Sequence, residues 1–432
     1  MSHRSTSRRL RVSALTRVEG EGGLHIAVHD GKVTSVELNI YEPPRFFEAF
    51  LRGRGYTEPP DITARVCGIC PVAYQMSACQ AIEDACGVHV GGQLAALRRL
   101  LYCGEWIESH ALHIYLLHAP DFLGLPDAIA LAERDRATLE RGLSLKKAGN
   151  AIMELVGGRS IHPINVRLGG FYRLPAKAEL AGLTEQLRRA LDEAIATARW
   201  ASTFEFPDAT IDHELLSLRD PGRYPIDTGT LVSSSGLDFS PAEYLDHVTE
   251  LQVPHSTALH ATLDGGRYLV GPLARYAMNA KWLSPTAREV ATDIGLGGRC
   301  RNPHRSILVR AVETVYAIDE ALRIIAEYEP PEIAAVDVSP RAGTGHGVTE
   351  APRGLLYHRY RIDTDGTIED AVIVPPTAQN QPAIEDDLRR LVSISLHLDD
   401  HELAHRCERA IRNYDPCISC SAHFLDLTVD RT

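Results

Sequence analysis

The sequence lacks three features that would each indicate a particular class of protein. It has no uninterrupted apolar run of about 18 residues, the length that a membrane-spanning helix needs. It has no dense run of lysine and arginine interleaved with aromatic residues, and its formal net charge is −12, so nucleic acid is not an expected partner. It also has no G-x-G-x-x-G segment after a predicted strand, so no dinucleotide site is expected on this chain.

Cysteine is sparse, with nine residues at irregular spacing in a chain of 432. Together with the lack of a secretory signal, this spacing argues against a disulfide framework and favours metal or redox use in a reducing compartment. We therefore expect a cytoplasmic protein. Apolar residues make up 44% of the chain and charged residues 24%, and no shift in composition marks a boundary, so residues 1–432 are expected to form one large body.

The hydrophobic periodicity predicts a mainly α fold with small β-sheets (α+β), built on a buried helical core with peripheral antiparallel strands. Alternating strands at 24–29 and 33–38 around Gly31 predict an N-terminal β-hairpin. Helices are expected at 71–88, 91–118, 134–156, 177–203, 241–250, 284–295, 305–327, 382–396 and 400–413. The expected segments are a basic tail (1–15), N-terminal strands with the first cysteine pair (16–70), a mainly helical part (71–327), a small sheet (328–376), C-terminal helices with the second cysteine pair (377–423) and a short tail (424–432).

Two C-x-x-C pairs stand near opposite ends of the chain, Cys67 with Cys70 and Cys417 with Cys420. The two-residue spacing lets both sulfurs of a pair bind one metal, so four thiolates could meet at one site. A zinc site with four cysteines is one interpretation, but such sites usually have about 15–20 residues between the pairs. Here 346 residues intervene, from 71 to 416.

The segments around the two pairs resemble the signature motifs of [NiFe]-hydrogenase large subunits. The first motif runs from Arg65 to Cys70 and the second from Asp415 to His423. The similarity extends, in family order, to the segments 17–20, 42–48 and 350–354, so it covers nearly the whole chain. The segments 42–48 and 67–73 are most similar to the alpha subunits of soluble NAD(P)-linked hydrogenases, also called sulfhydrogenases. Tyr74 and Ser109 depart from the histidine and aspartate of many other members, which fits this cytoplasmic branch.

The resemblance implies a nickel–iron centre that oxidises dihydrogen reversibly to protons and electrons. Cys70 and Cys420 would bridge nickel and iron, while Cys67 and Cys417 would bind nickel terminally, and carbon monoxide and cyanide would complete the iron. Soft thiolates suit these metals. Heterolytic cleavage of dihydrogen releases a proton that needs a base, and the resemblance gives this role to Cys417 backed by Glu19.

The resemblance also implies groups that surround the metals. Arg353 would lie over their open side as a fixed cation, and Asp415 would orient its guanidinium. Pro352 and Thr377 would pack against the cyanides or donate hydrogen bonds to them. A second site for magnesium, or for iron, would use Glu48, His423 and a backbone carbonyl placed at Val372; carboxylate and carbonyl oxygens suit a hard cation.

The partners that the resemblance implies begin with an iron–sulfur small subunit, since this chain has too few other cysteines for an electron relay. Flavin- and NAD(P)-binding diaphorase subunits would pass the electrons to a soluble carrier. A maturation endopeptidase and nickel chaperones are also implied, because related chains lose a short extension after the histidine that corresponds to His423, and nine residues, Phe424 to Thr432, follow it here.

Two other functions remain open from the sequence. One is a metal-free structural or quinone-site homologue like that of respiratory NADH dehydrogenase, against which the four retained cysteines argue. The other is a zinc-binding scaffold. His110, His113 and His118 share one helical run, but histidines on an apolar helix are more often satisfied core residues than ligands. The remaining cysteines, which stand singly, are expected to be small buried residues: Cys79, Cys86, Cys103, Cys300 and Cys407.

Overall fold

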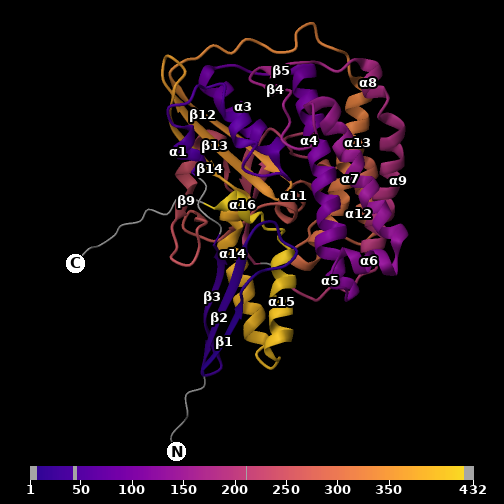
Figure 1. Ribbon diagram of the computed structural model, residues 1–432, viewed down its shortest axis with the longest axis vertical. Helices are drawn as coiled ribbons and strands as arrows, with labels where there is room; N and C mark the ends of the chain where they lie inside the picture. Colours follow the sequence, from indigo (N-terminus) through magenta and orange to yellow (C-terminus); the bar gives the residue numbers. More distant parts are fainter. Residues whose placement is uncertain (1–6, 42–45, 211, 423–432) are drawn as a thin grey trace, which may run out of the picture.

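The computed structural model describes residues 7–41, 46–210 and 212–422. Figure 1 shows three parts that surround the short helix α16 (Ile418–Ser421). A layer of long helices lies on one side, a three-stranded sheet with helix α3 lies on the other, and a second three-stranded sheet with two C-terminal helices extends below them. This arrangement confirms the predicted α+β fold, and no helix in the described part of the chain is long and apolar enough to cross a membrane.

The helical layer contains α4 (Gly92–Leu112), α7 (Arg136–Gly157), α9 (Thr184–Ala201) and α13 (Ser306–Glu327). Helix α13 packs against both α4 and α9, and α4 packs against α7. Two glycines allow the last contact, because a Cβ atom at Gly149 would lie 2.6 Å from the carbonyl oxygen of Gly104. The predicted helix at 91–118 is present, but its last turn, His113–His118, is a π-helix.

The predicted small sheet consists of β12 (Gly343–Ala351), β13 (Gly354–Ile362) and β14 (Ile368–Val374), all antiparallel. Helix α3 (Pro71–Cys86) lies across it. The glycines of β12 permit this packing: a Cβ atom at Gly345 would lie 2.0 Å from the carbonyl oxygen of Ala81, and one at Gly347 would lie 2.2 Å from that of Ser77. The glycine-rich segment therefore seats the strand against the helix that begins at the first cysteine pair.

The N-terminal hairpin is a three-stranded sheet, with β1 (Ser7–Val12) paired to β2 (Gly22–His29) and β2 to β3 (Lys32–Ile40). The assignment of residues 1–15 to a basic tail was therefore wrong for Ser7–Val12. The exposed Arg9 and Arg11 flank Leu10, which is buried, and Arg8 pairs with Asp400 at the start of α15. Alternation of this kind is a strand pattern with one face on the core. The sheet packs on α14 (Pro376–Ile394) and α15 (Asp400–Arg412).

The middle of the chain is less helical than expected. Residues 241–250 form only a short 3-10 turn (Pro241–Glu243), the single turn α10 (Tyr244–His247) and strand β9 (Val248–Leu251), which pairs with β10 (His260–Leu263). A four-stranded sheet accompanies them, made of β11 (Tyr268–Leu269), β6 (Glu214–Arg219), β7 (Thr230–Ser233) and β8 (Asp238–Phe239). These strands are too short for periodicity to identify them.

Two helix boundaries also differ from the prediction. The helix expected at 177–203 is divided into α8 (Lys177–Ala181) and α9, and α14 begins at Pro376 with Pro382 in its interior. The other helices are α1 (Phe47–Leu51), α2 (Pro59–Thr63), α5 (Ala119–Leu123), α6 (Ala128–Arg134), α11 (Pro272–Asn279) and α12 (Pro285–Asp293), with 3-10 turns at Ala280–Trp282 and Pro303–Arg305 and a short hairpin of β4 (Val166–Arg167) and β5 (Gly170–Phe171).

Candidate metal centre

The two cysteine pairs meet at one buried point between the helical layer and the small sheet. Cys70 is the residue before α3, which starts at Pro71, and Cys417 is the residue before α16. The Sγ atoms of Cys67 and Cys417 are 3.5 Å apart, those of Cys70 and Cys420 are 3.7 Å apart, and all four lie within 4.8 Å of one another. The expectation that four thiols from opposite ends of the chain converge is confirmed.

The electrostatics of this cluster favour a bound cation. Hydrogen bonds from Cys417, Cys420 and Cys70 hold the pKa of Cys67 well below that of a free thiol, so one thiolate is stabilised by three thiol neighbours. Burial raises the pKa of Cys417 and of Cys420, since further negative charge in an apolar site is costly. A bound metal ion would let all four thiols ionise. The donor set is soft sulfur, which fits nickel and iron, and fits zinc as well.

Glu19 lies directly against the second cysteine pair. Its backbone forms a β-bridge with Cys417, and its carbonyl accepts a hydrogen bond of 3.0 Å from the amide of Ile418. Its Oε2 accepts from the Cys417 thiol at 3.2 Å and from the amide of Ser419 at 3.0 Å. Burial raises the pKa of Glu19, and the neighbouring Cys67 thiolate raises it further. The structure therefore places the Glu19 carboxylate next to the Cys417 thiol, the pair that the family resemblance implied.

Arg353 and Asp415 form a buried ion pair beside the thiols. The Nε atom of Arg353 is 3.2 Å from Oδ2 of Asp415, and Arg310 approaches the same oxygen at 3.6 Å. No nitrogen of the Arg353 guanidinium makes a well-aligned hydrogen bond within the described residues. Burial alone would lower its pKa, but Asp415 and the cysteine thiolates outweigh burial and raise it. A buried cation with unused donors beside four thiols is a group ready to hold an anionic or polar ligand.

Pro352 and Thr377 are buried at the same site. The Oγ1 atom of Thr377, in the first turn of α14, accepts a 2.9 Å hydrogen bond from the amide of Cys417. Since this hydroxyl is seen only as an acceptor among the described residues, its hydrogen can donate to a further group. The carbonyl of Pro352 accepts from Arg275 at 2.9 Å, and Arg275 is also paired with Glu350 and Glu313. This ion cluster fixes the backbone that precedes Arg353.

The expected magnesium ligands are only partly placed. Glu48 accepts a 2.7 Å hydrogen bond from the amide of Ile373, and His423 lies outside the described residues. Because every described peptide bond is trans, the Val372 carbonyl points away from the Ile373 amide and so from this oxygen of Glu48. Val372 therefore does not fit the expected role. Ile373 lines a cavity of about 20 Å³ together with Glu48, Cys420 and Ala422, the residue before His423.

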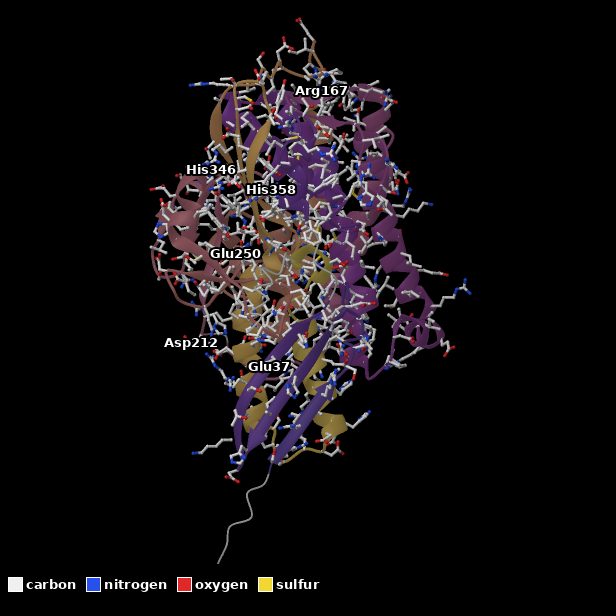
Figure 2. All side chains as sticks on the ribbon, turned by 60° about the vertical axis from the view of Figure 1, so that its left-hand side comes forward. Glu37, Arg167, Asp212, Glu250, His346 and His358 are labelled. Carbon is white, nitrogen blue, oxygen red and sulfur yellow. The ribbon has the colours of Figure 1, made fainter. Side chains whose placement is uncertain are left out.

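Two glutamates near the site were missed from the sequence. Glu105 of α4 accepts hydrogen bonds from the amides of Val72 (2.6 Å) and Ala73 (3.1 Å), so it fixes the first turn of α3 after Cys70. Glu250 of β9 has a buried Oε1 with no hydrogen-bond partner among the described residues, and its pKa is raised by burial and by the charge of Glu48. Figure 2 shows Glu250 near the middle of the molecule.

Tyr74, which stands where many members of the family have a histidine, also lies near the site. It lines the same small cavity as Cys420, and its ring lies 5.6 Å from that of His358, which Figure 2 labels on the small sheet. Burial and the nearby thiolates raise the pKa of its hydroxyl. Glu105 and Glu250 carried no sequence signal, because a glutamate within a regular element has no distinctive spacing.

The histidines of α4 and its π-turn are core residues, as expected. His110 pairs with Glu313 at 3.0 Å, His113 with the carbonyl of Arg412 at 2.8 Å, and His118 with the side chain of Asn413 at 3.0 Å. The five single cysteines are all free and buried, as predicted.

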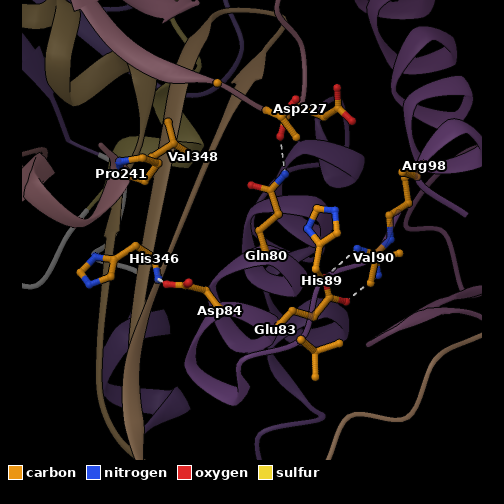
Figure 3. Close-up of a pocket in the computed structure, with 14 residues that line it drawn as sticks. Gln80, Glu83, Asp84, His89, Val90, Arg98, Asp227, Pro241, His346 and Val348 are labelled. Carbon is orange, nitrogen blue, oxygen red and sulfur yellow. Dashed lines mark hydrogen bonds and ion pairs between the residues drawn. The ribbon is translucent and has the colours of Figure 1, made fainter. Parts of the chain in front are cut away.

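The pocket in Figure 3, of about 290 Å³, is lined by Gln80, Glu83 and Asp84, from the second half of α3. Its polar groups are paired with one another. Arg98 bonds Glu83 at 2.6 Å, Gln80 donates to the carbonyl of Asp227, and Asp84 accepts from the amide of His346. None of the four clustered cysteines lines this pocket.

Comparison with known proteins identifies the family. The family model described as "Nickel-dependent hydrogenase" matches residues 45–156 and 263–423. The chain is 35% identical to sulfhydrogenase 1 subunit alpha of Pyrococcus furiosus, over 96% of this chain and 98% of the relative. It is 28% identical to NAD-reducing hydrogenase HoxS subunit beta of Cupriavidus necator, over 97% of this chain and 95% of the relative.

A solved NAD+-reducing [NiFe]-hydrogenase in its H2-reduced state has the same fold, with a TM-score of 0.87, 26% identity, and coverage of 97% of this chain and 100% of that chain. The Ni-Fe-Se hydrogenase of D. vulgaris Hildenborough matches with a TM-score of 0.78 at 23% identity, over the same shares of the two chains, and shares the fold. With the four thiols gathered at one buried point, these matches show that the chain belongs to the nickel-dependent hydrogenase family, as a large subunit of the [NiFe] type.

Proposed function

We propose that Cys67, Cys70, Cys417 and Cys420 hold a nickel–iron centre at which this subunit oxidises dihydrogen reversibly, with Cys70 and Cys420 bridging the two metals and carbon monoxide and cyanide on iron. The observation that carries the proposal is the convergence of four buried thiols, all within 4.8 Å, next to a carboxylate and a buried guanidinium. When bound, such a centre supplies the Lewis acidity and the electron acceptance that convert H2 into two protons and two electrons.

Elemental analysis of the mature complex tests the metal assignment. We expect one nickel per large subunit, lost together with hydrogenase activity when Cys420 is replaced by alanine. The matched control is Cys407→Ala, which removes a cysteine that is also buried but lies on α15 outside the cluster, and this variant should keep its nickel. Zinc in place of nickel in the mature, active complex would contradict the assignment.

The proton pathway begins at the thiol of Cys417 and continues through Glu19. The 3.2 Å contact between Cys417 Sγ and Glu19 Oε2 is within the reach of direct proton transfer. The Ser419 amide, bonded to the same oxygen, holds the carboxylate in place. Burial raises the pKa of Glu19 above that of a free carboxyl, which brings it closer to the range in which it can both accept and release a proton.

Arg353 supplies a fixed positive charge at the site, and Asp415 orients it. Thr377 holds the backbone of Cys417 and would donate its hydroxyl hydrogen to a ligand of the iron, and Pro352 would pack against that ligand. Both residues are buried, so water is excluded from these contacts. Substrate polarisation and ligand binding therefore come from groups that the fold has already positioned.

The second metal site would hold magnesium, or iron, with Glu48, His423 and the carbonyl of Ile373 in place of Val372. In an extended strand the amide and carbonyl of one residue point to the same side, so the Ile373 carbonyl faces Glu48 as its amide does. Glu250 adds a second carboxylate. Burial raises the pKa of Glu250, and the nearby charge of Glu48 raises it further. Two adjacent carboxylates suit a hard divalent cation.

Replacing Glu250 with glutamine tests this site. We expect magnesium affinity to fall by about 10- to 100-fold, since Glu250 supports the cation from beside Glu48. In magnesium-free buffer the variant should melt at a higher temperature than the parent, because it lacks a carboxyl group whose ionised form is destabilised by burial and by the charge of Glu48. The control is Glu243→Gln, which alters an exposed capping carboxylate just before α10. Unchanged magnesium affinity in Glu250→Gln would remove this residue from the site.

The relatives named above are subunits of hydrogenases with several chains, which implies partner subunits here. We propose an iron–sulfur small subunit that receives the electrons, flavin- and NAD(P)-binding diaphorase subunits that pass them to a nicotinamide carrier, and a cytoplasmic location. In the described residues the four-cysteine cluster is the only group of three or more cysteines, so an electron relay must be on another chain. Nickel chaperones and an endopeptidase that removes residues 424–432 would complete the site.

A further inference from the structure

A second group of metal-binding side chains lies outside the nickel–iron site. His255 precedes β10, His260 is the first residue of that strand, and Glu385 lies in the third turn of α14. The Nε2 atom of His255 is 2.8 Å from Oε1 of Glu385, and the Nε2 atom of His260 is 3.9 Å from the same oxygen. One ligand atom from each of the three residues lies within 4.8 Å of the other two.

These separations are close to those of a metal site. Ligand atoms at about 2.0–2.1 Å from a tetrahedral zinc ion lie roughly 3.3 Å from one another. The distance from His255 to Glu385 (2.8 Å) would have to increase slightly, and that from His260 to Glu385 (3.9 Å) would have to decrease. Rotations of the side chains allow both changes. Two imidazoles and one carboxylate match the ligand set of zinc sites that keep a fourth position for water.

His260 provides independent support for a ligand. Its side chain is 10% exposed, and its Nε2 atom has no hydrogen-bond partner among the described residues. Burial lowers the pKa of this ring, so it is neutral and its Nε2 can offer a lone pair. A buried ring nitrogen without a partner is costly, and the atom is aimed at a carboxylate that already holds a second histidine.

The charges around the cluster favour a cation. Glu385 is the carboxylate in contact, and Glu37 of β3, labelled in Figure 2, adds negative charge near His255. Among the positive charges that act on His260 is Arg267, whose guanidinium is paired with Asp386 at 2.5 Å. The soft-to-borderline nitrogen donors disfavour magnesium, which prefers oxygen ligands alone.

We propose that His255, His260 and Glu385 form a binding site for one divalent transition-metal ion of the zinc class. The site is separate from the nickel–iron centre, since Glu385 is eight residues along α14 from Thr377, about 12 Å in a helix. The proposal does not depend on the proposed catalytic roles, and nickel content reports on those independently.

The ion would join three segments that flank the second cysteine pair. Glu385 Oε1 also accepts the amide of Leu38 in β3, at 2.8 Å. Ala258, between the two histidines, forms a β-bridge with Ala422, which follows the second cysteine pair by two residues. A metal bound here would thus fasten β3, β10 and α14 beside the segment that carries the second cysteine pair, which makes its role structural.

The test is zinc titration of the mature complex after treatment with a chelator, followed by calorimetry and metal counting. The parent should bind one zinc ion per large subunit beyond its nickel, and His260→Ala should lower the affinity for zinc by at least about 100-fold. The matched control is His247→Ala, since His247 pairs with Asp264 at 3.1 Å and no third ligand joins them in the part of the chain that the structure describes; this variant should bind zinc as the parent does.

A second pair of measurements covers the case in which His260→Ala does not assemble. Glu385→Gln keeps the shape of the carboxylate and should also weaken zinc binding, and cobalt bound to the parent should give a visible absorption spectrum of tetrahedral or five-coordinate cobalt with nitrogen ligands. The proposal is overturned if the parent binds no zinc beyond its nickel-site and magnesium-site metals, or if Glu385→Gln and His260→Ala bind zinc with the parent's affinity.

Discussion

Replacing Glu19 with glutamine is expected to lower the rate of hydrogen oxidation by about 10²- to 10⁴-fold, the range in which a positioned acid–base group contributes. Glutamine keeps the shape of the side chain and can still accept the hydrogen bond from the Ser419 amide, but it cannot take the proton of Cys417. The fold and the metals should therefore stay in place while proton transfer is lost. The measurement is dye-linked hydrogen oxidation beside nickel content.

Isotope exchange separates this role from a structural one. In the Glu19→Gln variant, exchange between D2 and water should fall together with turnover, because the deuteron no longer reaches solvent. Glu19→Asp, with a shorter carboxylate, should recover part of the rate, and Glu21→Gln, which changes an exposed carboxylate two residues along the chain, should match the parent. A Glu19→Gln variant with normal nickel content and normal exchange would show that the proton leaves by another route.

Replacing Arg353 with lysine is expected to lower kcat by about 10²- to 10³-fold, the loss found when one preorganised donor to a reacting group is removed. The charge is retained, but the planar guanidinium, held 3.2 Å from Asp415, is lost. The guanidinium is closely surrounded by protein, since Arg353 is only 2% exposed. Its partner Asp415 adopts the left-handed backbone conformation, with φ at 51°. Nickel content should be unchanged.

Two further variants test the reason for the effect. Asp415→Asn should give a smaller loss, because the guanidinium stays but is less firmly oriented, so Asp415 acts as a positioning residue. Arg361→Lys changes an exposed arginine of the same strand region, paired with Glu369 at 2.9 Å, and should leave turnover unchanged. If Arg353→Lys keeps the parent's kcat at full nickel loading, the guanidinium has no part in the reaction.

The site was predictable where its residues stand in motifs. The four cysteines, Glu19 and Arg353 are each part of a short segment with a family pattern, and the fold brings them together as expected. Glu105 and Glu250 were not predictable, because each acts through a contact formed only when distant elements meet: α4 with the start of α3, and β9 with α1. Sequence spacing carries no information on such contacts.

The fold shows the same division. The long helices α4, α7 and α13 were predicted because an apolar stripe of twenty or so residues has an unambiguous period. The strands between Glu214 and Leu269 were missed, because runs of two to six residues give no reliable period. The sequence could not decide between Val372 and Ile373 for a related reason: a shift of one residue in a strand reverses the direction of the carbonyl, and sequence alone does not fix that register.

Infrared spectroscopy of the purified mature complex, in the region where metal-bound carbon monoxide and cyanide absorb, tests the central claim most directly. Zinc bound by the same four cysteines would give no such bands, and neither would a metal-free homologue. The account predicts one carbonyl band and two cyanide bands, present in the parent and in Glu19→Gln and absent from Cys420→Ala. A mature, metal-loaded complex without these bands would contradict the nickel–iron centre and, with it, the proposed catalytic roles of Glu19 and Arg353.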